Sequence, residues 1–147
     1  AMDAAGTGGA MEPLDRILPH LDVYVPSLAE AVHQTGLDDP QRIVKVYRDC
    51  GATGLLGVKL GTSGVLLSTG PDEFEHIDAA APPGDVIDTT GAGDNFYAGL
   101  LCGLLRGLSV RDAGRLGAAA AACGVTAVGG SRGGRDFAFT AKLAGLD

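Results

Sequence analysis

The chain has 147 residues, of which 46% are hydrophobic and 20% are charged, and its formal net charge is −7. This length and composition indicate one folded domain and exclude a disordered chain, while 24 glycines without a repeat exclude a collagen-like fibre. Because binding of nucleic acids needs clustered Lys and Arg, the acidic balance and the scattered basic residues argue against a nucleic-acid partner.

The predicted elements show apolar spacing typical of helices or of strands, with glycine and proline between them. In chain order they are a helix over 11–20, a strand over 22–26, helices over 28–34 and 40–50, strands over 54–60, 65–68 and 74–79, and helices over 92–106, 110–125 and 137–144. We interpret residues 1–2 as a tag remnant or initiator methionine and residues 3–6 as the end of a strand.

The residues between these elements support their boundaries. Ser27 followed by Glu30 predicts a capping box at the start of the second helix, which Gly36 ends. The turn at 61–64 makes its two flanking strands a hairpin, and Ser109 is an expected N-cap. Alternation of strand and helix, then a hairpin and paired helices, indicates a layered α/β domain.

The sequence shows neither a secretory signal nor an apolar run of transmembrane length, which predicts that the protein has no membrane partner. Its three cysteines, Cys50, Cys102 and Cys123, form no CxxC pair. Cysteines in this number and spacing are typical of small buried thiols in a cytoplasmic protein.

The most informative segment is the glycine-rich turn at residues 88–99, which leads into a long apolar run. Gly91 and Gly93 let the chain turn sharply into a helix whose first N–H groups lack intrahelical partners. Together with the helix dipole, these N–H groups make a site for a phosphate or a developing oxyanion. Asp94 lies beside them and can accept a proton from a substrate hydroxyl. The alternative is a tight turn followed by a helix-favouring acid.

Residues 88–99 match every fixed position of the pattern D-T-x-G-A-G-D-x-F-x-A-G, and the chain therefore resembles the PfkB (ribokinase-like) carbohydrate kinases, whose second signature this is. Three further segments are similar to the family in the same order: a nucleotide-binding strand-turn-strand at 59–65, an alanine-rich helix and glycine-rich segment at 118–130, and an N-x-x-E element at 25–30. The resemblance implies an α/β fold, a ribokinase-like three-layer Rossmann-type sandwich, with residues 3–147 forming its C-terminal nucleotide-binding and catalytic portion.

The resemblance also implies an enzyme, a carbohydrate kinase that moves the γ-phosphate of ATP to a hydroxyl of a sugar or, alternatively, of a nucleoside. Asp94 would be the catalytic base, and the N–H groups of Gly91, Ala92 and Gly93 would form the anion hole for the phosphoryl group. The residues implied to contact the nucleotide are Lys59, Gly61, Gly64, Ala120 and Gly124. For Lys59 the alternative is a solvated strand end, and for the alanine block at 118–122 it is close helix packing.

Two metal sites follow from the same resemblance. Glu30 would help to organise Mg²⁺ through water, and Asp88 and Thr90 would contribute to a monovalent-cation site for K⁺. The sequence departs from the family at Ser27, where asparagine is usual. A capping box formed by Ser27 and Glu30 explains both residues without a metal, and the two interpretations are compatible.

The resemblance covers nearly the whole chain but only the C-terminal half of a typical member. The family's substrate-binding aspartate, Gly-Gly motif and lid strands are not found in this sequence. We therefore expect the fragment to be inactive alone, and to form a homo-oligomer or pair with the missing half, because a half-sheet exposes an unpaired edge. The alternative function is a non-catalytic nucleotide-binding or regulatory module.

Overall fold

The computed structural model of the chain describes residues 11–146, so the strand end expected at residues 3–6 lies outside the described residues. The chain forms two compact units. Within the described residues, the first comprises 11–61 and 65–76, and the second comprises 62–64 and 77–146.

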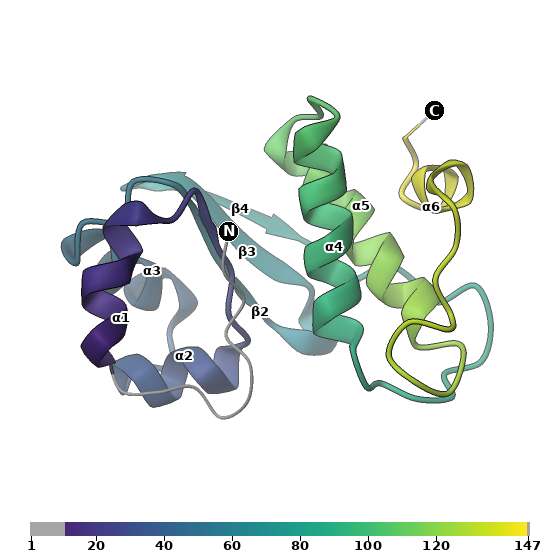
Figure 1. Cartoon of the computed structure of the whole chain (residues 1–147), viewed down its shortest axis with the longest axis horizontal. Helices are drawn as coiled ribbons and strands as arrows, with labels where there is room; N and C mark the ends of the chain where they lie inside the picture. Colours follow the sequence, from purple (N-terminus) through teal and green to yellow (C-terminus); the bar gives the residue numbers. More distant parts are fainter. Residues whose placement is uncertain (1–10, 147) are drawn as a thin grey trace. The chain divides into compact units, whose positions relative to one another are not determined.

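The first unit combines a sheet with helices that pack on it (Figure 1). Its elements are α1 Met11–Ile17, the 3₁₀ turn Leu18–His20, β1 Val23–Tyr24, α2 Leu28–Thr35, α3 Pro40–Asp49, β2 Leu55–Lys59, β3 Val65–Gly70 and β4 Glu73–Ile77. Among the described residues these strands form one four-stranded sheet in the order β1-β2-β3-β4. Strand β1 is parallel to β2, and β2 is antiparallel to β3, which confirms the predicted hairpin.

Two predicted elements are shorter than expected, and proline explains both. The strand expected over 22–26 is regular only in β1, because Pro26 has no N–H to donate to the ladder. The helix expected over 11–20 is an α-helix only to the end of α1. It then tightens into a 3₁₀ turn that contains Pro19, which likewise lacks the donor that an α-helix needs.

The core of the first unit lies around α2 and α3, which pack against β2. It also contains a polar contact, in which the Tyr47 hydroxyl donates to Gln34 Oε1 at 2.6 Å and Gln34 Nε2 donates to the Tyr24 hydroxyl at 2.9 Å. Because these buried groups satisfy one another, the core keeps them at little cost. The buried hydrophobic members are Leu14, Leu18, Tyr24, Ala31, Ile43, Val44, Tyr47, Ala52, Leu56 and Val58.

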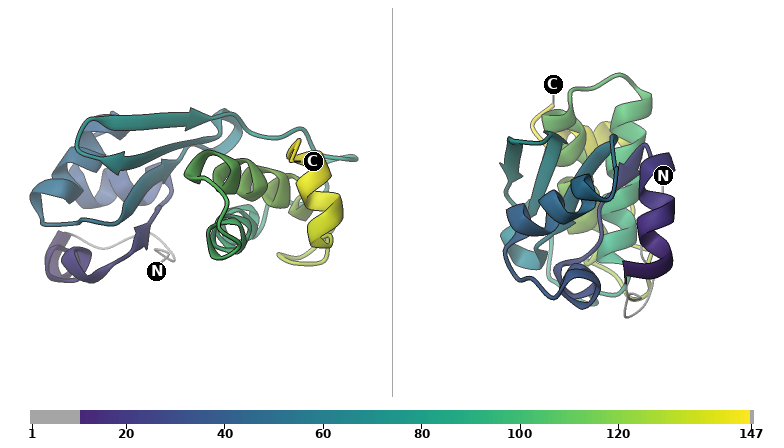
Figure 2. Two further views of the ribbon diagram at one scale, coloured as in Figure 1. Left: turned by 90° about the horizontal axis from the view of Figure 1, so that it is seen from above. Right: turned by 90° about the vertical axis from the view of Figure 1, so that its left-hand side faces the viewer.

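The second unit is built on two closely packed helices, α4 Ala92–Leu105 and α5 Val110–Gly124, followed by α6 Phe137–Leu143. Figure 2 shows α4 and α5 side by side in both views. A Cβ added at Gly103 would lie 2.8 Å from the Cα of Ala113, so only small residues fit this contact. Within residues 11–146, no helix is both long and apolar enough to cross a lipid bilayer.

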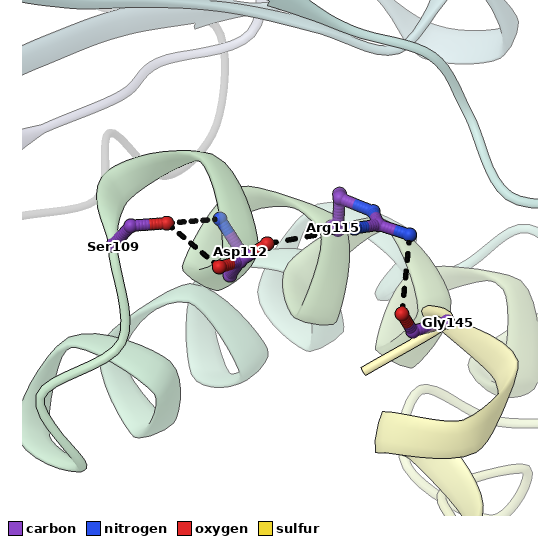
Figure 3. A network of polar contacts seen from close by, with 4 residues as sticks. All are labelled: Ser109, Asp112, Arg115 and Gly145. Carbon is purple, nitrogen blue, oxygen red and sulfur yellow. Dashed lines mark hydrogen bonds and ion pairs between the residues drawn. The ribbon is translucent and has the colours of Figure 1, made fainter. Parts of the chain in front are cut away.

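A polar chain links the start of α5 to the end of α6 (Figure 3). Ser109 accepts from the Asp112 backbone N–H at 3.1 Å, which confirms it as the N-cap, and its hydroxyl donates to Asp112 Oδ2 at 2.8 Å. Arg115 pairs with Asp112 at 3.5 Å and donates to the carbonyl oxygen of Gly145 at 3.4 Å. These contacts hold α6 beside α5.

Candidate active site

The glycine turn enters α4 with its backbone in the left-handed region. Gly91 is the N-cap residue, with φ 74° and ψ 7°, and no side chain caps the first turn. An added Cβ at Gly91 would lie 2.7 Å from the Cα of Gly130, so both the dihedral angles and the space require glycine here. The N–H groups of this first turn are therefore left to a backbone carbonyl, to water or to an anion.

One N–H group of the proposed anion hole, that of Ala92, forms a hydrogen bond within the turn. The Ala92 N–H donates to the carbonyl oxygen of Thr89 in a long bond of 3.2 Å, while the Gly91 carbonyl oxygen accepts from the Asn95 backbone N–H at 2.9 Å. Asp94 lies in the same first turn, at the positive end of the helix, and is exposed. An exposed carboxylate at this position is open to a substrate hydroxyl.

Asp88 tethers the start of the turn. Its carboxylate accepts from the Gly129 N–H at 2.9 Å and from the Thr90 N–H at 2.9 Å. These two bonds, with that from Gly129 the stronger influence, hold the pKa of Asp88 below the ordinary aspartate value. Asp88 is therefore ionised at neutral pH and joins the turn to the loop after α5, while its role at a K⁺ site stays a prediction.

Asn95 is a residue of the site that the sequence pattern missed, because it occupies a variable position of the motif. Its side-chain Nδ2 donates to the carbonyl oxygen of Gly91 at 2.8 Å and to that of Gly130 at 2.5 Å. The second bond joins positions 35 residues apart, and nothing in the spacing of the sequence indicates it.

Two of the predicted nucleotide residues, Ala120 and Gly124, face α4. An added Cβ at Gly99 would lie 2.8 Å from the Cβ of Ala120, and one at Gly124 would lie 2.6 Å from Nδ2 of Asn95. The close-packing alternative thus accounts for both small residues, and their contact with a nucleotide stays a prediction. Gly64 also has a structural cause, since its φ is +87° and a Cβ there would run into the Ile77 carbonyl oxygen.

The remaining predicted residues lie in the first unit, at the carboxyl end of the parallel pair β1 and β2. Ser27 and Lys59 form a parallel bridge there, and the Lys59 N–H donates to the Pro26 carbonyl oxygen at 2.8 Å. The carboxyl end of parallel strands is where ligands bind in open α/β sheets. Gly61 lies two residues after Lys59 and is exposed, with φ +62°.

Glu30 takes part in the capping box at the start of α2. Its Oε2 accepts from the Ser27 N–H at 2.8 Å and from the Ser27 hydroxyl at 2.7 Å, and its side chain is buried. Both bonds end on one oxygen, so the capping box does not use Oε1. Among residues 11–146 no cluster of three metal-ligating side chains occurs.

Comparison with known proteins shows the family to which this chain is similar. The family model of the pfkB family carbohydrate kinases matches residues 1–135. The ATP-dependent 6-phosphofructokinase of Thermoanaerobacterium thermosaccharolyticum is 32% identical over 118 residues, which cover 80% of this chain and 35% of that protein. The 2-dehydro-3-deoxygluconokinase of Bacillus subtilis is 37% identical over 108 residues, which cover 74% of this chain and 32% of that protein.

The fold is also found among solved structures. A ribokinase of Arabidopsis thaliana, complexed with ribose and ATP, matches with a TM-score of 0.86 and 26% identity, covering 97% of this chain and 46% of that one. The expected α/β, ribokinase-like fold class is therefore confirmed. The chain spans about a third of the length of these curated relatives and less than half of that ribokinase.

Proposed function

The chain belongs to the pfkB family of carbohydrate kinases, and on this premise we propose that it supplies the phosphoryl-transfer part of an enzyme that moves the γ-phosphate of ATP to a sugar hydroxyl. The observation that carries the proposal is the position of Asp94, exposed in the first turn of α4, three residues after the left-handed cap Gly91. The carboxylate of Asp94 and the N–H groups that we assign to the anion hole thus come from four consecutive residues.

Asp94 acts on the acceptor. Its carboxylate takes the proton of the attacking hydroxyl as the oxygen bonds to phosphorus, a contribution on the order of 10²–10⁴ in rate for a positioned base. Because Asp94 sits on a helix rather than on a mobile loop, its distance from the N–H groups of the same turn is fixed by the helix geometry.

The turn acts on the phosphoryl group. The N–H groups of Gly91, Ala92 and Gly93, at the positive end of α4, stabilise the charge on the oxygens of the group being transferred. The Ala92 N–H gives up a long bond to Thr89 when it does so. Phosphoryl transfer depends mainly on positioning and on charge stabilisation, so this arrangement supplies what the reaction needs from the protein.

The residues that we assign to ATP are Lys59, Gly61, Gly64, Ala120 and Gly124. Mg²⁺, when bound, neutralises charge on the phosphates, and Glu30 would hold it through water, with Asp88 and Thr90 assigned to a monovalent cation. A nucleoside is the alternative acceptor, and a panel of sugars and nucleosides assayed with the full-length protein distinguishes the two.

Asp94→Asn in the full-length protein tests the assignment. The amide cannot take the proton, so kcat falls by about 10²–10⁴ while the affinity for ATP, measured by calorimetry, changes little. Asp112→Asn is the matched control, since Asp112 lies in the first turn of the neighbouring helix α5 and should leave turnover intact. Retained turnover in Asp94→Asn would contradict the role given to Asp94.

A non-catalytic nucleotide-binding module is the second candidate, and the capping box favours it. Ser27 stands at the family's asparagine position, and the Glu30 carboxylate is already engaged by two bonds from Ser27. In that case the full-length protein binds ATP in calorimetry but transfers no phosphate to any member of the acceptor panel, and Asp94→Asn changes neither result.

A further inference from the structure

Asn95 makes two hydrogen bonds from one nitrogen atom. Its Nδ2 donates to the carbonyl oxygens of Gly91 and Gly130, at 2.8 Å and 2.5 Å. We propose that Asn95 is a positioning residue, which orients the N–H groups of the glycine turn by holding these two carbonyl groups. This inference rests on the phosphoryl-transfer function proposed for the turn.

The first bond acts on the peptide group that carries an anion-hole donor. The carbonyl of Gly91 and the N–H of Ala92 belong to one trans peptide, in which they point in opposite directions. Asn95 holds that carbonyl twice, through Nδ2 and through its backbone N–H at 2.9 Å. Fixing the oxygen therefore fixes the direction in which the Ala92 N–H points.

The second bond braces the turn against the loop after α5. Gly91 and Gly130 lie in contact, so that a Cβ on Gly91 would be 2.7 Å from the Cα of Gly130. Asp88 makes a parallel connection, since its carboxylate accepts from the N–H of Gly129 at 2.9 Å. The turn is thus attached to this loop at two places, once by Asp88 and once by Asn95.

Only a side chain with a two-proton donor can hold both carbonyls from this position. A serine hydroxyl has one proton to give, and an aspartate of the same shape would place an acceptor oxygen against two carbonyl oxygens. Asn95→Asp therefore repels the two oxygens that Asn95 attracts. A residue that merely filled space would tolerate this isosteric change.

Gly124 offers a second, independent way to disturb the same contact. A Cβ at Gly124 would lie 2.6 Å from Nδ2 of Asn95 and 2.9 Å from its Cγ, so Gly124→Ala must displace the carboxamide. The same substitution favours the helix, because alanine has a higher helix propensity than glycine. Any loss of activity in Gly124→Ala is therefore not explained by a weaker α5, and an unchanged KM for ATP separates it from the role that we assign to Gly124 in ATP binding.

The experiment compares kcat, the KM for the acceptor and the melting temperature of the full-length protein with those of Asn95→Ala, Asn95→Asp and Gly124→Ala. We expect kcat to fall about tenfold to a hundredfold in each, with Asn95→Asp at least as low as Asn95→Ala and the acceptor KM unchanged. The double variant Asn95→Ala/Gly124→Ala should lose little more than either single one, since both remove the same contact.

Thr140→Val is the matched control. Its hydroxyl donates to the Asp136 carbonyl oxygen at 2.7 Å, in α6, which carries none of the residues assigned to the site, so its loss should leave kcat unchanged. A kcat retained by Asn95→Ala while Asp94→Asn is inactive would overturn the positioning role and leave the proposed function standing. A lower kcat that only follows the fraction unfolded would also overturn it. If the unaltered protein transfers phosphate to no acceptor, both proposals are wrong.

Discussion

The pKa of the Asp88 carboxylate is lowered from its ordinary value by hydrogen bonds that it accepts. The N–H of Gly129 and then that of Thr90 stabilise the charged form, so the folded protein binds the proton less well than the unfolded chain. The resulting stability is present above the ordinary aspartate pKa and is lost as the pH falls through the lowered one. We expect the Gly129 amide resonance to move with pH in the range below about pH 4, and to stop doing so in Asp88→Asn. An Asp88 carboxyl that titrates at or above its ordinary value in an NMR titration would contradict this.

At the contact between α4 and α5, helix propensity and side-chain packing change the free energy of unfolding in opposite directions. Helix propensity alone says that Gly103→Ala stabilises α4 by about 1 kcal/mol. The added Cβ would, however, lie 2.8 Å from the Cα of Ala113 and 2.9 Å from its Cβ, which are rigid atoms. Because overpacking a tight contact costs about 1–3 kcal/mol, we expect the free energy of unfolding to fall, as measured by urea denaturation.

The control for this helix pair is Ala98→Gly, at an exposed position of the same helix. It should cost about 1 kcal/mol, through propensity alone. If Gly103→Ala instead gained stability by the amount that Ala98→Gly loses, the helices would be adjusting freely and the contact would not be tight.

The elements of this fold follow from local spacing, whereas its long-range contacts do not. The capping box of Ser27 and the N-cap Ser109 depend on residues three positions apart, and both are present as the sequence predicts. Arg48 gives no such signal: it looks like an ordinary helix charge, yet it donates to the carbonyl oxygens of Gly54 and Ser68 at 2.7 and 2.9 Å. Such hydrogen-bond partners depend on the tertiary structure and leave no signal in the local spacing of the sequence.

The residues of the candidate site also fall into those that local sequence predicts and those that depend on long-range contacts. The motif predicted the glycine turn and placed Asp94 in the first turn of the helix, because both depend on consecutive residues. The motif could not predict Asn95, whose partner Gly130 lies 35 residues further along the chain. Nor does the sequence indicate that Gly124 lies against the Asn95 side chain, where an added Cβ would be 2.6 Å from Nδ2.

At the scale of the whole chain, the net charge is −7, so an anion such as ATP gains nothing from the overall field of these 147 residues and must be held by local groups. A ligand that binds only the folded chain raises its stability by about 2.7 kcal/mol at 100 times its Kd. We therefore expect ATP with Mg²⁺ to raise the melting temperature of the 147-residue chain by several degrees, increasing with ATP concentration. Calorimetry should show the same rise in melting temperature for Asp94→Asn, since Asp94 is assigned to the acceptor. Inorganic triphosphate should give a smaller rise, because it lacks the adenine. A melting temperature that does not move at millimolar ATP would show that this chain alone does not form the nucleotide site.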